Sequence, residues 1–76
     1  MNKARAKRIS KLQASLSEIK DELYEILSEE QDYFDNMPEA FQQGERGSIA
    51  ESAISALNDA VEAVETAEGS LDEAAG

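Results

Sequence analysis

The chain has 76 residues, among them 17 acidic and 7 basic ones, and a formal net charge of −10. It contains no cysteine and no histidine, which excludes a disulfide scaffold and the common zinc sites. This length fits one small domain over residues 1–76, and no apolar run reaches the 18 or so residues that a membrane span requires.

Residues 3–36 are predicted to form one long amphipathic helix. Apolar residues recur there at alternating spacings of three and four, the heptad pattern of helices that pack side by side. Neither proline nor glycine interrupts the segment, and strong helix formers dominate it. The predicted packing seam of this helix consists of Ile9, Leu12, Leu16, Ile19, Leu23 and Ile26.

A connecting bend is predicted over residues 37–46. Pro38 disfavours helical backbone at the residue before it, so the first helix should end near Asn36. Pro38 is also suited to begin a short turn, and Gly44 with Gly47 allows a tight change of direction. A connection this short makes the two flanking helices antiparallel neighbours.

A second helix is predicted over residues 47–72. Ser48, followed three residues later by Glu51, is typical of a capping box at a helix start. Glu68 occupies a heptad position where an apolar residue is expected. The predicted seam consists of Ile54, Leu57, Val61 and Val64. Beside it, alanines at every seventh residue would let another helix approach closely; these are Ala53, Ala60, Ala67 and Ala74.

The predicted fold class is therefore all-α, an antiparallel two-helix hairpin with frayed ends at residues 1–5 and 73–76. Two helices in a chain of fewer than about 80 residues form a small core that supplies little stability. A twofold homodimer in the form of a four-helix bundle would bury more apolar surface. We expect such a homodimer, with docking of the apolar stripe onto another protein as the alternative.

The charge is distributed unevenly along the chain. Residues 1–11 contain five basic residues and no acid, whereas residues 12–76 contain seventeen acids and two bases. In an antiparallel hairpin the basic arm, Lys3–Lys11, lies beside the acidic end of the second helix, and this attraction favours the antiparallel arrangement. The arm has no interleaved aromatic residue and the remaining chain repels phosphate, so we expect no direct nucleic-acid binding.

The sequence contains few of the residue types and patterns of an active site. Without histidine and cysteine, the usual general base and thiolate nucleophile are missing. There is no glycine-rich phosphate loop and no EF-hand loop. A di-iron bundle is excluded as well, because its Glu-x-x-His pairs cannot occur in a chain without histidine. We predict a protein that is not an enzyme, with no catalytic residue, no metal ligand and no cofactor.

The acidic residues of the two helices are the candidate binding surface. Residues 12–76 would carry about one net charge per 3 Å of hairpin axis, using the helical rise. Duplex DNA carries about one per 1.7 Å. Tyr24 is predicted to face away from the seam, as a surface residue or as an anchor for a partner. The candidate acidic residues are Glu18, Asp21, Glu22, Glu25, Glu29, Asp59, Glu62 and Glu65.

The segment 36–47 has the sequence NMPEAFQQGERG, which is the most distinctive stretch of the chain. It resembles small acidic proteins of bacteriophages and prophages that have an N-[LM]-P-E…Q…E-R-G bend between two heptad helices. The resemblance runs from about Leu12 onward. Small acidic phage proteins include inhibitors of host defence nucleases, among them anti-CRISPR proteins that mimic DNA, so the resemblance implies by analogy a phage-encoded inhibitor in the bacterial cytoplasm.

Together these observations predict a non-enzymatic acidic module that binds a host or phage protein through that protein's basic surface. The alternative is a small structural or assembly homo-oligomer, in which the acids only keep the helices in solution.

Overall fold

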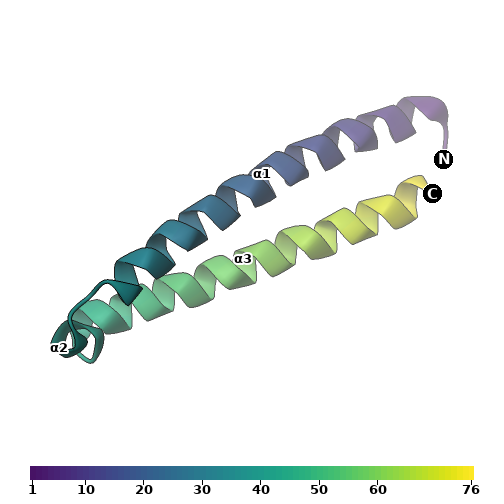
Figure 1. Cartoon of the computed structure of the whole chain (residues 1–76). Coiled ribbons are helices and arrows are strands. Elements are labelled where there is room, and N and C mark those ends of the chain that lie inside the picture. Colours follow the sequence, from purple (N-terminus) through teal and green to yellow (C-terminus); the bar gives the residue numbers. More distant parts are fainter.

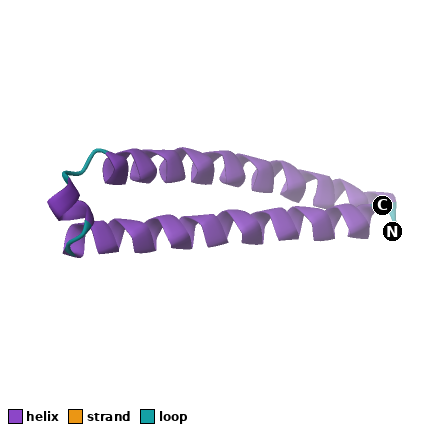
Figure 2. Ribbon diagram, turned by 60° about the horizontal axis from the view of Figure 1, so that its bottom comes forward, coloured by secondary structure: helices purple, strands orange, loops and turns teal.

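The computed structural model describes all 76 residues and contains three helices and no strand. The helices are α1 (Lys3–Asp35), α2 (Glu39–Gln42) and α3 (Glu45–Ala75). The helices α1 and α3 run side by side in opposite directions, so both termini lie at one end and α2 at the other (Figure 1). The predicted antiparallel hairpin is confirmed. Its Cα atoms extend over 58 × 15 × 12 Å, the proportions of a rod (Figure 2).

The first helix begins and ends at side chains that satisfy its free backbone groups. Asn2 is the N-cap, and its Oδ1 accepts a hydrogen bond of 2.8 Å from the amide of Arg5. At the other end, the amide and the Nδ2 of Asn36 both donate to the carbonyl of Asp32. Two residues later Pro38 prevents the helix from continuing.

The bend is fixed by close contact between backbone segments. The short helix α2 fills it, and the Gln42 Nε2 donates a 2.9 Å hydrogen bond to the carbonyl of Phe34 at the end of α1. Gly47, in the first turn of α3, packs so tightly on the backbone of Gln42 that a Cβ there would overlap it. Glycine is therefore required at residue 47 by lack of space.

The third helix is longer than predicted at both ends. It begins at Glu45 with Gly44 as the N-cap, and no side chain caps it. The predicted capping box of Ser48 and Glu51 is therefore wrong, because both residues lie inside the helix. The helix starts two residues earlier than predicted, so that Gly47 lies in its first turn against α2. Helical backbone then continues through Gly69 to Ala75.

The contact between α1 and α3 forms a thin core. Only Gly47, Ala50 and Val61 are buried, all of them in α3. The remaining contact is made by half-buried residues in heptad spacing on each helix. On α1 these are Ala6, Ile9, Gln13, Leu16, Lys20, Leu23, Leu27, Glu30 and Phe34, and on α3 they are Ile54, Leu57, Val64, Glu68 and Leu71, flanked by the half-buried Ala53, Ala60 and Ala67.

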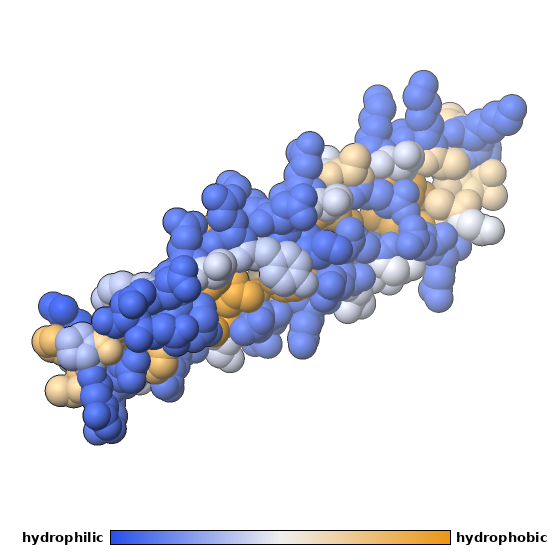
Figure 3. All heavy atoms as spheres, in the orientation of Figure 1, coloured by the Kyte–Doolittle hydropathy of each residue, from blue (hydrophilic) through white to orange (hydrophobic).

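The hairpin differs from the predicted seam at three positions of α1. Ile9, Leu16 and Leu23 are half-buried as expected, whereas Leu12, Ile19 and Ile26 are exposed. The contact instead follows residues 13, 20 and 27, one position further along the chain, so α1 is rotated about its axis relative to the prediction. Figure 3 shows one side of the rod, on which hydrophobic atoms lie between hydrophilic ones and at both ends.

Candidate functional site

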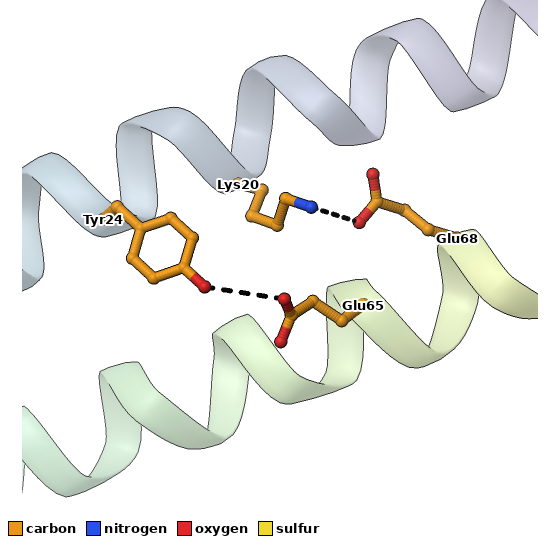
Figure 4. Close-up of polar contacts among 4 residues, drawn as sticks. All are labelled: Lys20, Tyr24, Glu65 and Glu68. Carbon is orange, nitrogen blue, oxygen red and sulfur yellow. Dashed lines mark hydrogen bonds and ion pairs between the residues drawn. The ribbon is translucent and has the colours of Figure 1, made fainter.

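Two polar contacts join the middle of α1 to α3. The Lys20 Nζ lies 2.8 Å from Glu68 Oε1 and forms the one ion pair of the structure. One turn away, the Tyr24 hydroxyl lies 3.5 Å from Glu65 Oε2, a long hydrogen bond. Figure 4 shows both side chains of α1 reaching across to the two carboxylates of α3. Glu68, which sits at a predicted seam position, is thus explained by a cation at the matching level of α1.

The electrostatic surroundings of Lys20 favour its charged form. The hydrogen bond to Glu68 raises the pKa of Lys20 above its ordinary value of 10.5, and the charges of Glu68 and Glu65 act in the same direction. Partial burial opposes the shift but does not outweigh it. Lys20 therefore stays protonated at neutral pH and holds the pair together.

The basic arm, Lys3–Lys11, lies at the same end of the rod as the C-terminus of α3 (Figure 1). The predicted proximity of opposite charges is therefore present. None of the arm's five basic side chains forms an ion pair with an acid of the hairpin, however, and the nearest link is the 2.6 Å hydrogen bond from Gln13 to Asp72. The attraction is diffuse rather than made of paired groups.

All eight candidate acidic residues are exposed, but they do not form one face. Glu18 stands two residues from both Leu16 and Lys20, about half a turn around α1 from the contact with α3. Asp59 stands two residues from both Leu57 and Val61, so it points away from α1. By the same spacing Glu25 groups with Glu18. Glu62 follows Asp59 by three residues and therefore lies about 60° around α3 from it. The acids thus lie along two opposite outer edges of the rod.

The remaining candidate acids lie on the broad sides of the rod. Glu65 lies beside Tyr24. Glu22 and Glu29 flank the exposed apolar residues of α1, three or four positions from Ile19 and Ile26. Asp21 is exposed as well.

The prediction that Tyr24 faces away from the seam is wrong, because its ring is about half exposed and its hydroxyl lies against Glu65 of α3. Tyr24 borders an open hollow of about 360 Å³ together with Leu27, Ser28, Gln31, Asp32 and Asn58. The exposed edge of its ring is accessible to a partner side chain there.

A row of large apolar residues is exposed along α1. Leu12, Ile19, Ile26 and Tyr33 follow one another at seven-residue spacing and are between 44 and 55 % exposed. We call these four residues the exposed row. Three of them, Leu12, Ile19 and Ile26, belong to the predicted seam, because a heptad pattern does not specify which of two adjacent columns faces the partner helix.

No group of three or more potential acidic ligands is placed to hold a metal ion. None of the helices has the length and apolar composition needed to cross a bilayer.

No family model, curated protein or solved structure matches this chain.

Proposed function

We propose that this protein is a non-enzymatic acidic module that binds a basic, nucleic-acid-binding surface of another protein. Its resemblance to small phage proteins points to a phage-encoded inhibitor or modulator of a host protein, acting in the bacterial cytoplasm by imitating the charge of DNA. The observation that carries the proposal is the set of eight exposed carboxylates, none of which is in an ion pair. A basic partner could therefore bind these carboxylates without first breaking an ion pair within the hairpin.

The two outer edges of acids suit a partner that surrounds the rod. A flat basic surface would meet either Glu18 and Glu25 or Asp59 and Glu62, since these pairs face opposite ways. A basic channel or cleft in the partner would contact both pairs at once. Nucleic-acid channels have this form, with positive charge along their walls.

The proposal can be tested by capture from a bacterial host lysate, followed by elution with salt and with duplex DNA. We expect the captured protein to be released by increasing salt and by DNA, because both compete for the same basic groups. Quadruple replacement of Glu18, Glu25 and Glu62 by Gln and of Asp59 by Asn should reduce binding at least tenfold.

The matched control also removes four charges, at and near the bend, with Asp35→Asn, Glu39→Gln, Glu45→Gln and Glu51→Gln, and should change binding little. Binding that persists at high salt and in the quadruple variant would contradict the electrostatic proposal. Loss of binding after replacing the α1 pair alone, with the α3 pair dispensable, would indicate a flat partner surface instead of a channel.

A second candidate function is favoured by the exposed row. A rod that leaves four large apolar side chains on one helix is suited to self-association, and a homodimer would form a four-helix bundle. In that case the protein is a small structural or assembly component whose acids keep it in solution. Glu→Gln replacements would then be tolerated, whereas polar replacements in the exposed row would abolish function.

A further inference from the structure

The exposed row and the alanines of α3 lie on the same side of the hairpin. The contacts Lys20–Glu68 and Tyr24–Glu65 close one side of the groove between the helices (Figure 4). On α1 the exposed row lies on the other side of the seam from Lys20, and on α3 the alanine column lies on the other side from Glu68. One broad face of the rod is therefore mainly apolar and carries the exposed row together with the half-buried Ala53, Ala60 and Ala67, with Glu30 beside Ile26 and Tyr33.

The amount of exposed surface matches what a dimer interface covers. The chain exposes 5589 Å², whereas a compact monomer of this mass is expected to expose about 4,600 Å². The excess of about 1,000 Å² is close to the roughly 800 Å² that each partner buries in a standard interface. The elongated hairpin thus leaves about as much additional surface uncovered as one partner buries in a standard dimer.

The order of residues along α1 favours one arrangement of that contact. Extended by one heptad, the exposed row reads Arg5, Leu12, Ile19, Ile26 and Tyr33, with Ile19 at its centre. When two such rows run antiparallel, Leu12 meets Ile26 and Arg5 meets Tyr33, where a guanidinium can stack on the ring.

Charge next to the row supports the same arrangement. Arg8 and Glu29 flank opposite ends of the row, so antiparallel packing centred on Ile19 brings each Arg8 close to Glu29 of the second copy. Parallel packing of the two rows would instead bring Arg8 to Arg8 and Glu29 to Glu29. Packing of the row on α3 of the second copy offers no cation at the level of Glu29, because Arg46 at the bend is the one basic residue of α3.

Each end of the apolar face has a hollow, and the same twofold axis brings the two kinds of hollow together. A hollow of about 240 Å³ at the N-terminal end is bordered by Arg5, Arg8 and Leu12. A hollow of about 270 Å³ at the bend is bordered by Tyr33, Met37 and Phe41, and Arg46 lies 5.3 Å above the Phe41 ring. A twofold axis at Ile19 places the N-terminal hollow of each copy over the bend hollow of the other.

We propose that a second copy of this chain covers the apolar face, with the two α1 helices antiparallel and the twofold axis at Ile19. This inference rests on the second candidate function, the homo-oligomer, and specifies its interface. It also gives the basic arm a role, because Arg5 and Arg8 set the orientation of the dimer.

Cysteine cross-linking of the full chain tests the arrangement directly, since the natural chain contains no cysteine. Under mild oxidation Ile19→Cys should form a covalent dimer. Leu12→Cys and Ile26→Cys should each remain uncoupled when alone and should couple to one another when the two proteins are mixed. Ser17→Cys, exposed on a different side of α1, is the matched control and should remain monomeric on a denaturing gel.

A charge exchange provides a second test that leaves the core unchanged. Arg8→Glu and Glu29→Arg should each weaken the dimer about three- to tenfold in sedimentation equilibrium, because each replacement turns two attractive pairs into repulsive ones. The double exchange should restore the affinity.

The possible outcomes distinguish failure of this particular interface from failure of the homo-oligomer proposal. A helical monomer at micromolar concentration would overturn both. A dimer in which Leu12→Cys couples to itself, or in which Ile19→Cys does not couple, would overturn this interface and leave the homo-oligomer standing.

Discussion

Two glycines of α3 show how differently one residue type can act. Gly47 lies against the backbone of Gln42 and leaves no space for a Cβ, whereas a Cβ at Gly69 would meet nothing within 4 Å. Gly69 is exposed and lies in the interior of a helix, where glycine is unfavourable because of its backbone freedom. The first glycine is a packing requirement and the second a weakness.

Replacing these glycines by alanine should therefore have opposite effects. Gly69→Ala should stabilise the hairpin by about 0.5–1 kcal/mol through helix propensity. Gly47→Ala should destabilise it by about 1–3 kcal/mol, since the added methyl overlaps the bend. Thermal unfolding followed by circular dichroism measures both. Equal effects of the two substitutions would contradict the tight contact at Gly47.

At the scale of the elements, α1 and α3 are held together by half-buried apolar residues and by one central ion pair. Lys20 and Glu68 stand within the packing rows of their helices, where most positions are apolar. A polar pair in a heptad row fixes the register of helices, because any shift would leave both charges without a partner. The pair therefore specifies how α1 is aligned with α3.

This pair predicts a loss of stability at alkaline pH. The pKa of Lys20 is raised by Glu68, so its stabilising contribution is complete below the ordinary value of 10.5 and is lost as the pH rises through the value in the folded hairpin. The thermal midpoint should thus fall more steeply between about pH 9 and pH 12 in the natural chain than in Lys20→Arg, where the cation persists. Identical alkaline slopes in the two proteins would refute a stabilising role of the pair.

At the scale of the whole molecule, the protein is a rod with an excess of negative charge. The net charge of −10 is distributed over a length of 58 Å, and the carboxylates point outward along both edges. Mutual repulsion among them opposes folding and association, and salt screens it beyond about 10 Å at 0.1 M.

Salt should therefore have opposite effects on folding and on partner binding. Between about 0.02 and 0.5 M NaCl the thermal midpoint should rise, because the repulsion within the rod is screened. The variant with Asp59→Asn and Glu62→Gln should show a smaller rise, since it starts with less repulsion. A midpoint that falls with salt would mean that attractive pairs outweigh repulsion.

Much of the architecture follows from the sequence alone. The heptad spacing and the lack of proline and glycine before Asn36 determine α1, and Pro38 with the glycines after it determines the reversal of direction. These are local effects, because they depend on residues within a turn or two of each other. The candidate acids were equally recognisable, since charged residues outside the apolar positions of an amphipathic helix are exposed.

The tertiary structure decided which column of each helix faces the other. A heptad pattern with apolar residues in several adjacent columns is satisfied by more than one rotation of the helix, and only the packing against the bend and α3 selects among them. That selection pairs Lys20 with Glu68 and divides the acids between two edges. It also leaves the exposed row on one face, because a single partner helix can cover only part of a wide apolar stripe.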